Sequence, residues 1–241
     1  MANLARITRK HMEEEETGGT GELLRQTILG GQDGLVNVLG IVLGVAAATS
    51  DARMVLVAGF AAAFAESVSM AAVAYTSTRA EQDHYRRMLA VEKYEMENLP
   101  DIEREEIRMI YRKKGFWGKD LERVVKVITG NKKMWLDVMM KEELGLVDVG
   151  GIKPKNEALV VGVSSFIGSL LPLLAFLVLP ISSAFFAAIA ISLVILFAAG
   201  MVKGKLTTGK ILHDGVEMAV IGGLAAIVGY LVGTLAGAAG L

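Results

Sequence analysis

Residues 54–78 read MVLVAGFAAAFAESVSMAAVAYTST and contain a single charged side chain, Glu66, in 25 residues. A helix of about 20 apolar residues crosses the roughly 30 Å hydrocarbon layer of a membrane. Strands of a membrane barrel are shorter and alternate apolar with polar residues, so this stretch predicts a transmembrane helix. A charged residue near the middle of such a helix is costly to insert, which makes Glu66 a candidate functional residue.

Four further stretches have the same composition. They occupy residues 28–49, 158–179, 181–202 and 216–241, and the charged side chains in them are Asp33 and Glu217. The whole chain has 25 Lys and Arg and 26 Asp and Glu, so nearly all of its charge lies between the apolar stretches. This distribution excludes a soluble globular domain. It predicts an all-α membrane protein with five transmembrane helices.

The second transmembrane helix should extend well beyond the apolar stretch. No glycine or proline occurs between Phe60 and Leu99, so nothing in that range interrupts a helix. Pro100 should end it, and Asp101 is a candidate N-cap of the next helix.

Two further amphipathic helices are predicted at residues 119–129 and 132–143. Residues 79–155 should therefore form a helical domain inserted between transmembrane helices 2 and 3. Trp117 and Trp135 both fall inside it and are expected to anchor its core.

The predicted organisation has four parts. These are an N-terminal segment (1–27), transmembrane helices 1 and 2 (28–78), the inserted domain (79–155) and transmembrane helices 3 to 5 (156–241).

The orientation follows from the basic residues in the connections. One side carries Arg6, Arg9, Lys10, Arg25, the basic residues of the insert, Lys203, Lys205 and Lys210, whereas Arg53 stands alone on the other. Because Lys and Arg accumulate on the cytoplasmic side, we expect the N-terminus and the insert in the cytoplasm and Leu241 on the opposite side. The protein should then reside in the cell membrane of a prokaryote or a vacuolar-type membrane of a eukaryote.

Composition excludes several classes of function. The net charge of −1 gives no reason to expect nucleic acid as a partner, and the absence of cysteine rules out thiolate sites. No glycine-rich phosphate loop or nucleophile triad is present, so we expect no enzyme and no ATP-driven pump. Residues 81–84 match Glu-x-x-His, half of a di-iron motif, but no second copy accompanies it.

A polar track is predicted inside the membrane. Asp33 and Asn37 lie one turn apart in the first transmembrane helix, and Glu66 and Met70 lie one turn apart in the second. A short connection around residues 50–53 makes the two helices antiparallel, so these side chains can occupy similar depths. Each ionisable group in a bilayer needs a partner or a water-filled path. We expect this set to line a translocation path.

The insert contains a second group of candidate ligands. Glu92 with Glu95 and Glu103 with Glu106 are spaced i, i+3, which places the two carboxylates of each pair on one helix face. Like charges so placed repel unless a cation lies between them. Oxygen ligands suit Fe²⁺, Mn²⁺, Mg²⁺ or Ca²⁺, and sulfur shifts the preference toward softer first-row metals. The sulfur and the fifth carboxylate would come from Met139, Met140 and Glu143. A merely solvated helix face remains the alternative, because Lys and Arg are interleaved with these residues.

Glycines spaced four residues apart mark predicted helix contacts. Gly30 and Gly34, Gly40 and Gly44, and Gly229 and Gly233 follow this spacing. Small residues at such intervals let helices approach closely in a membrane, so we expect these positions to serve packing.

Several motifs together resemble the vacuolar iron transporter family. They are Asp33-Gly34-Leu35-Val36-Asn37, Leu43-Gly44-Val45, Ser69-Met70-Ala71, Gly215-Val216-Glu217-Met218 and Gly222-Gly223-Leu224-Ala225-Ala226. The resemblance runs from about residue 25 to the C-terminus. It implies five transmembrane helices, a cytoplasmic metal-binding domain between the second and third, a homodimer, and export of Fe²⁺, often also Mn²⁺, from the cytosol in exchange for protons.

The resemblance also implies site residues. Metal ligands of the family match Glu92, Glu95, Glu103, Glu106, Glu143, Met139 and Met140, and translocation residues match Asp33 and Met70. Relatives usually carry a glutamate where this chain has Ala74, and Glu66, on the same helix face, is expected to take its role. We expect no prosthetic group, with Zn²⁺, Co²⁺ and Ni²⁺ as further ions that bind in vitro. A membrane-anchored metal sensor or buffer without transport is the alternative function.

Overall fold

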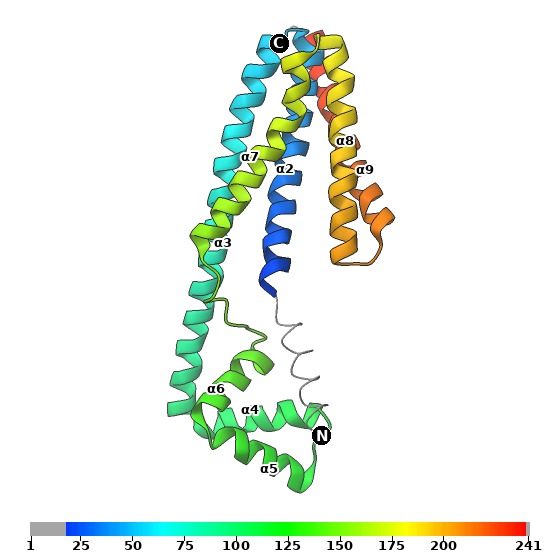
Figure 1. Cartoon of the computed structure of the whole chain (residues 1–241). Helices are drawn as coiled ribbons and strands as arrows, with labels where there is room; N and C mark the ends of the chain where they lie inside the picture. Colours follow the sequence, from blue (N-terminus) through cyan, green and yellow to red (C-terminus); the bar gives the residue numbers. More distant parts are fainter. Residues whose placement is uncertain (1–17, 240–241) are drawn as a thin grey trace. The chain divides into compact units, whose positions relative to one another are not determined.

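The computed structural model describes residues 18–239, with side chains from Leu23 onward, and these residues are helical with short connections (Figure 1). The elements are α2 (Gly18–Thr49), α3 (Ala52–Asn98), α4 (Pro100–Lys113), α5 (Gly118–Thr129), α6 (Lys132–Val138), the π-helical turn η1 (Met139–Glu143), α7 (Pro154–Val178), α8 (Ile181–Leu206) and α9 (Ile211–Ala238). The expectations for residues 1–17, including Arg6, Arg9, Lys10 and His11, lie outside the described residues.

The chain divides into two compact units, and the boundary falls inside α3. The bundle unit comprises the described residues 18–75 and 155–239, and the helical insert comprises Thr76–Pro154. Five helices, α2, α3, α7, α8 and α9, are long and apolar enough to cross a membrane. Within the described residues, the prediction of five helices able to cross a membrane is thus confirmed. The first of them begins earlier than the apolar stretch suggested, at Gly18.

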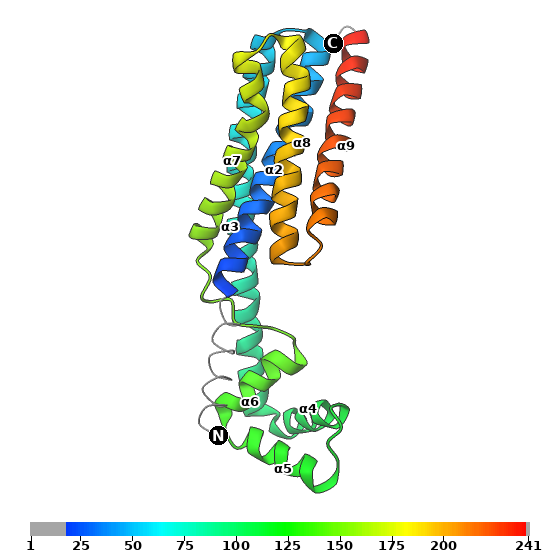
Figure 2. The ribbon, with the colours of Figure 1, turned by 45° about the vertical axis from the view of Figure 1, so that its right-hand side comes forward.

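Glycines allow the helices of the bundle unit to pack closely, as predicted. A Cβ atom added at Gly229 would lie 2.1 Å from the Gly40 carbonyl oxygen, and one at Gly233 would lie 2.0 Å from that of Gly44. A real Cβ cannot approach an oxygen so closely, so α2 and α9 require glycine at these positions. Figure 2 shows α8 and α9 side by side in the same unit, joined by a short turn.

The insert has its own apolar core. Ile107, Leu121, Val125, Ile128, Trp135 and Met139 are buried together. Arg108 on α4 holds Glu122 on α5 through a hydrogen bond of 2.8 Å between Nε and Oε1, which fixes the two helices side by side. Asn131 accepts hydrogen bonds from the backbone of Lys133 and Met134 and caps α6. These contacts position the candidate ligands of α4 and η1 against the end of α3.

Two expectations about the insert are wrong. Asp101 does not cap α4, because Pro100 already occupies the first turn and Leu99 is the N-cap residue. Trp117 does not anchor the core. Its side chain is 67% exposed in the turn between α4 and α5, whereas Trp135 is 4% exposed and lies in the core as predicted. Positive φ angles at Gly115 and Gly118 bend the chain on both sides of Trp117, which is the N-cap residue of α5.

Candidate metal centre

Three carboxylates of the insert converge where α3 meets α4. Glu92 and Glu95 come from the last turns of α3, and Glu103 comes from the first turn of α4. One oxygen from each side chain lies within 4.8 Å of one from each of the others. Pro100 makes this corner, because it cannot continue α3 but suits the first turn of α4. The sharp turn brings Glu103 close to Glu92 and Glu95.

The remaining two glutamates belong to the same electrostatic group. Burial raises the pKa of Glu92 to about 7, and the charges of Glu143, Glu95 and Glu106 contribute. Burial likewise raises the pKa of Glu103 to about 8, with contributions from the other four glutamates. Partial desolvation and the charges of Glu106 and Glu95 also raise the pKa of Glu143. The charges of neighbouring glutamates in this group thus contribute to the raised pKa values of Glu92, Glu103 and Glu143.

Two of these carboxylates are buried and incompletely bonded. Glu92 and Glu103 are each 3% exposed, and within the described part of the chain the Oε2 atom of each has no hydrogen-bond partner. A buried carboxylate oxygen without a donor is costly, and a protein usually satisfies it with a proton, a water molecule or a cation. A divalent first-row ion fits this donor set, because it supplies positive charge to several carboxylates at once.

The methionines lie on η1, next to the fifth glutamate. Met139 is fully buried and belongs to the core of the insert, and Met140 is 2% exposed. The π-helical turn spans Met139–Glu143, and the Leu144 amide donates to the Met139 carbonyl oxygen at 3.2 Å. Such turns widen a helix locally and are frequent at functional sites. The sequence predicted an ordinary helix here, and the π geometry was missed because side-chain spacing does not reveal it.

A second polar group lies in the bundle unit. The carboxyl group of Glu66 on α3 makes side-chain hydrogen-bond contacts with Asp33 and Asn37 on α2. Asp33 and Glu66 are half-buried, and Asn37 is exposed on the single chain. Met70 follows one turn after Glu66 and is half-buried. The structure thus brings the two carboxyl groups and the amide together. Glu81 and His84 of the rival motif lie exposed on α3.

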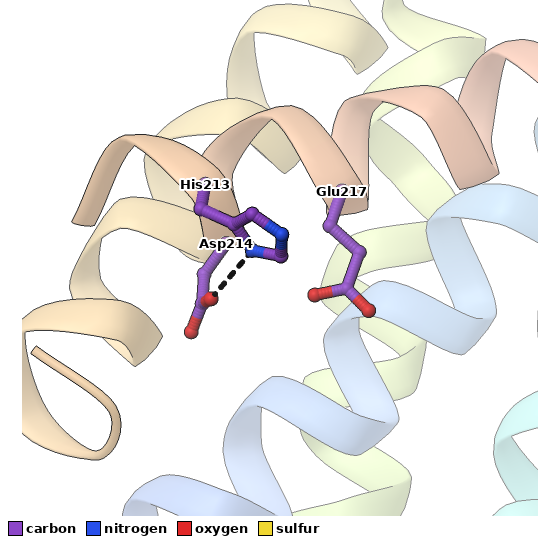
Figure 3. A group of neighbouring side chains, drawn as sticks. All are labelled: His213, Asp214 and Glu217. Atoms are coloured by element: carbon purple, nitrogen blue, oxygen red, sulfur yellow. Dashed lines mark hydrogen bonds and ion pairs between the residues drawn. The ribbon is translucent and has the colours of Figure 1, made fainter. Parts of the chain in front are cut away.

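A third group lies at the start of α9, and the sequence indicated Glu217 but not its grouping with His213 and Asp214. Ligand atoms of His213, Asp214 and Glu217 lie within 4.8 Å of one another, and Figure 3 shows the imidazole between the two carboxylates. Asp214 is 3% exposed, accepts a hydrogen bond of 2.8 Å from the Thr208 hydroxyl and lies 3.3 Å from Nδ1 of His213. These contacts satisfy the buried carboxylate of Asp214 and link the turn between α8 and α9 to the first turn of α9. We therefore assign this group a structural role.

The chain is similar to vacuolar iron transporters over most of its length. The chain is 32% identical to vacuolar iron transporter 1 of Oryza sativa subsp. japonica over 231 residues, which cover 95% of this chain and 92% of the relative. It is 31% identical to vacuolar iron transporter 1 of Arabidopsis thaliana, over 91% of this chain and 88% of the relative. It is 32% identical to the vacuolar iron transporter of Toxoplasma gondii, over 92% of this chain and 77% of the relative.

The family assignment covers nearly the entire chain. Residues 24–234 match the model of the VIT family, a range that contains most of each of the five long apolar helices. The resemblance inferred from the sequence motifs is confirmed. This chain belongs to the VIT family.

Proposed function

We propose that this protein exports Fe²⁺, Mn²⁺ or both from the cytosol in exchange for protons. The observation that carries the proposal is the contact of Glu66 with Asp33 and Asn37 between two membrane-spanning helices. Two carboxylates that meet inside a bilayer cannot both remain charged without a cation, because water is scarce there. They hold either a proton or a metal ion, and alternation between these two states couples the two fluxes.

The insert supplies the metal on the cytoplasmic side. Its five glutamates form a binding site of high negative charge, and Met139 and Met140 lie on η1 together with Glu143. Metal binding there displaces the protons that the raised pKa values of Glu92 and Glu103 retain near neutral pH. The ion then passes to the polar group of Asp33, Asn37, Glu66 and Met70.

The membrane orientation and a homodimer complete the proposal. Lys203 and Lys205 lie in the last turn of α8. Because α8 is the fourth spanning helix, its C-terminal end is expected on the same side of the membrane as that of the second, α3, from which the chain enters the insert. These basic residues therefore favour a cytoplasmic insert. Asn37 is exposed and Glu66 half-exposed on a single chain. Polar groups facing hydrocarbon are unfavourable, so a second copy that covers this face would complete the path.

The relatives favour iron as the cargo, since their names describe vacuolar iron transporters. Carboxylate ligands accept Fe²⁺ and Mn²⁺ alike, and the thioether of Met70 favours both over Ca²⁺ and Mg²⁺. The alternative, a membrane-anchored sensor or buffer, uses the insert alone. An anchor has no use for carboxylates that meet within the bundle, so the observed contact favours transport.

The test is metal flux into proteoliposomes that hold the full chain, with an imposed pH gradient and internal metal and pH indicators. Export by proton exchange predicts metal accumulation that follows the gradient and a matching proton flux of opposite direction. Metal binding to the insert without any flux would instead establish the sensor or buffer.

A further inference from the structure

A cavity in the insert lies between α3 and α6 and is lined by lysines. It has a volume of about 310 Å³, and its basic lining residues are Lys93 from α3 and Lys132 and Lys133 from α6. Among the described residues that line it, Glu97, one turn after Lys93, is the one acidic side chain. Three ammonium groups and one carboxylate leave the cavity with an excess of two positive charges.

The three lysines of this cavity have no negative partner of their own. Elsewhere in the insert exposed lysines form ion pairs, as Lys141 does with Asp137 at 2.8 Å. Over the residues that the structure describes, no such pair involves a lysine of the cavity. Lys93 and Glu97 make none either, although their spacing of i, i+4 on one helix suits an ion pair. Their charge is therefore available to a bound anion.

The lining of the cavity also includes Trp135 and Met96. Trp135 is 4% exposed, and in the described part of the chain its indole nitrogen has no hydrogen-bond partner. An indole N–H can only donate, so this buried group lacks an acceptor. The cavity therefore combines unpaired positive charge, an unsatisfied donor and an apolar surface.

These properties fit a phosphate group. A phosphate on an organic molecule carries a charge of about −1.5 to −2 at pH 7 and three strong acceptor oxygens, which matches an excess of two positive charges. Lysine binds phosphate as a point charge. The backbone at the start of α6 adds nothing, because Asn131 already accepts from the amides of Lys133 and Met134. A volume of about 310 Å³ lies at the lower end of ligand cavities, about 300–1,000 Å³, so the bound part of the ligand is small.

We propose that the cavity between α3 and α6 binds a phosphate group, carried by a small soluble molecule or by a lipid headgroup. The phosphate oxygens are the acceptors that the three ammonium groups and the indole N–H lack, and Trp135 and Met96 contact the carbon atoms next to the phosphate. Because α6 continues directly into η1, which carries Glu143, the bound group holds this segment against α3. The site uses none of the membrane carboxylates, so it stands or falls independently of the proposed transport.

The test measures binding of inorganic phosphate to the metal-free full chain in detergent, at an ionic strength held constant with chloride. Every protein carries Trp117→Phe at an exposed position, which leaves Trp135 as the only tryptophan, so its emission reports occupancy of the cavity. The site variant is Lys93→Gln with Lys132→Gln and Lys133→Gln. The matched control removes the same charge from three other exposed lysines of the insert, by Lys113→Gln, Lys126→Gln and Lys153→Gln.

A second arm distinguishes the two sources of phosphate. The same proteins are placed in lipid nanodiscs of phosphatidylcholine with or without phosphatidic acid, and no free phosphate is added. A change in Trp135 emission with phosphatidic acid but not with inorganic phosphate assigns the site to a lipid headgroup, and the reverse assigns it to a soluble phosphate.

The site variant should bind phosphate at least about tenfold more weakly, because three charge contacts of modest strength are lost together, whereas the control should change less than about twofold. Glu97→Gln removes the opposing charge and should tighten binding about twofold or more. This gain cannot come from a damaged fold. An equal loss in the site variant and the control, or no binding in either arm, overturns the inference.

Discussion

The two carboxylate groups of this chain differ in number, in surroundings and in what they need to become stable. The insert gathers five glutamates, and two of them, Glu92 and Glu103, are 3% exposed with one oxygen unpartnered in the described structure. The polar group between α2 and α3 in the bundle unit has one pair, Asp33 and Glu66, whose contacts include an amide. Many carboxylates in one place store and release protons as metal arrives, whereas a single pair can be occupied by one ion at a time.

The difference predicts that the glutamates of the insert and the membrane pair have separate roles. The insert determines how much metal is collected, and the membrane pair determines whether it moves. Changes in each group should therefore affect different measurements, and the comparison fails if they do not.

The largest effect is expected from the membrane pair. Asp33→Asn with Glu66→Gln keeps the shape of both side chains but removes both titratable groups, so neither metal nor proton is held at depth. Proton-coupled flux in proteoliposomes should fall at least about 100-fold, as expected when about 3 kcal/mol of stabilisation is lost. Metal binding by the insert and the yield of folded protein should stay unchanged.

Glu81→Gln provides the control, because Glu81 is an exposed glutamate on the same helix. It should transport at the unmodified rate. If the double variant still transports at that rate with an intact pH dependence, the proposed path is incorrect and the sensor alternative gains support.

The next effect concerns the insert. Replacing Glu92, Glu95, Glu103 and Glu106 by Gln removes four of the five carboxylates, so calorimetry on the purified full chain should show about 100-fold weaker binding of Mn²⁺ or more. Flux at saturating metal should fall less than in the membrane variant. Glu97→Gln, at an exposed position on the same helix, is the matched control. Unchanged affinity in the quadruple variant would refute the assignment of this site.

A smaller effect is expected from pH on the metal-free insert. The pKa values of Glu92 and Glu103 rise from 4.5 to about 7 and about 8. Below about pH 4.5, Glu92 and Glu103 are protonated in both the folded and the unfolded chain. As the pH rises, these two side chains lose their protons in the unfolded chain first and keep them longer in the folded chain. Stability of the metal-free insert should therefore be greatest at low pH and fall as the pH passes through about 7 to 8.

Glu103→Gln mimics the protonated side chain and should raise the midpoint of thermal unfolding at pH 8 without metal. Each kcal/mol shifts the midpoint by about 4–8 °C in a domain of 60–100 residues. Tryptophan emission follows the transition, because both tryptophans lie in the insert. A lower midpoint than in the unmodified chain would contradict the assigned protonation of Glu103, and added Mn²⁺ should reverse the order of the two proteins.

The smallest effect is expected from Met70→Ala. Loss of the thioether should weaken discrimination between Fe²⁺ and Ca²⁺ about tenfold, because carboxylates alone accept both ions. Competition of Ca²⁺ with iron flux measures this change. Met54→Ala, at an exposed methionine near the start of α3, is the control and should leave selectivity unaltered. Equal selectivity in all three proteins would show that Met70 does not contact the transported ion.

Most of the fold could be predicted, because the length of an apolar stretch and the position of a proline are local properties of the sequence. The five apolar stretches, the long uninterrupted α3 and the turn at Pro100 all follow from neighbouring residues in the sequence. The expectations that were wrong, for Asp101 and Trp117, concerned details that depend on the exact turn geometry. An N-cap and an exposed loop tryptophan are decided by one or two backbone angles, which composition does not reveal.

The sequence by itself determined which residues are candidate ligands, because intramembrane charges and glutamate pairs are visible as patterns. Only the tertiary structure decided that Glu92, Glu95 and Glu103 share one site, that Glu66 meets Asp33, and that Ser165 and Ser169 are buried without partners. These facts depend on which helix faces touch, and contacts between distant segments are set by close packing at glycines such as Gly34 rather than by local preference. The unpaired hydroxyls of Ser165 and Ser169 lie at that glycine packing, whereas the raised pKa values of Glu92 and Glu103 in the insert follow from burial and from the neighbouring glutamate charges.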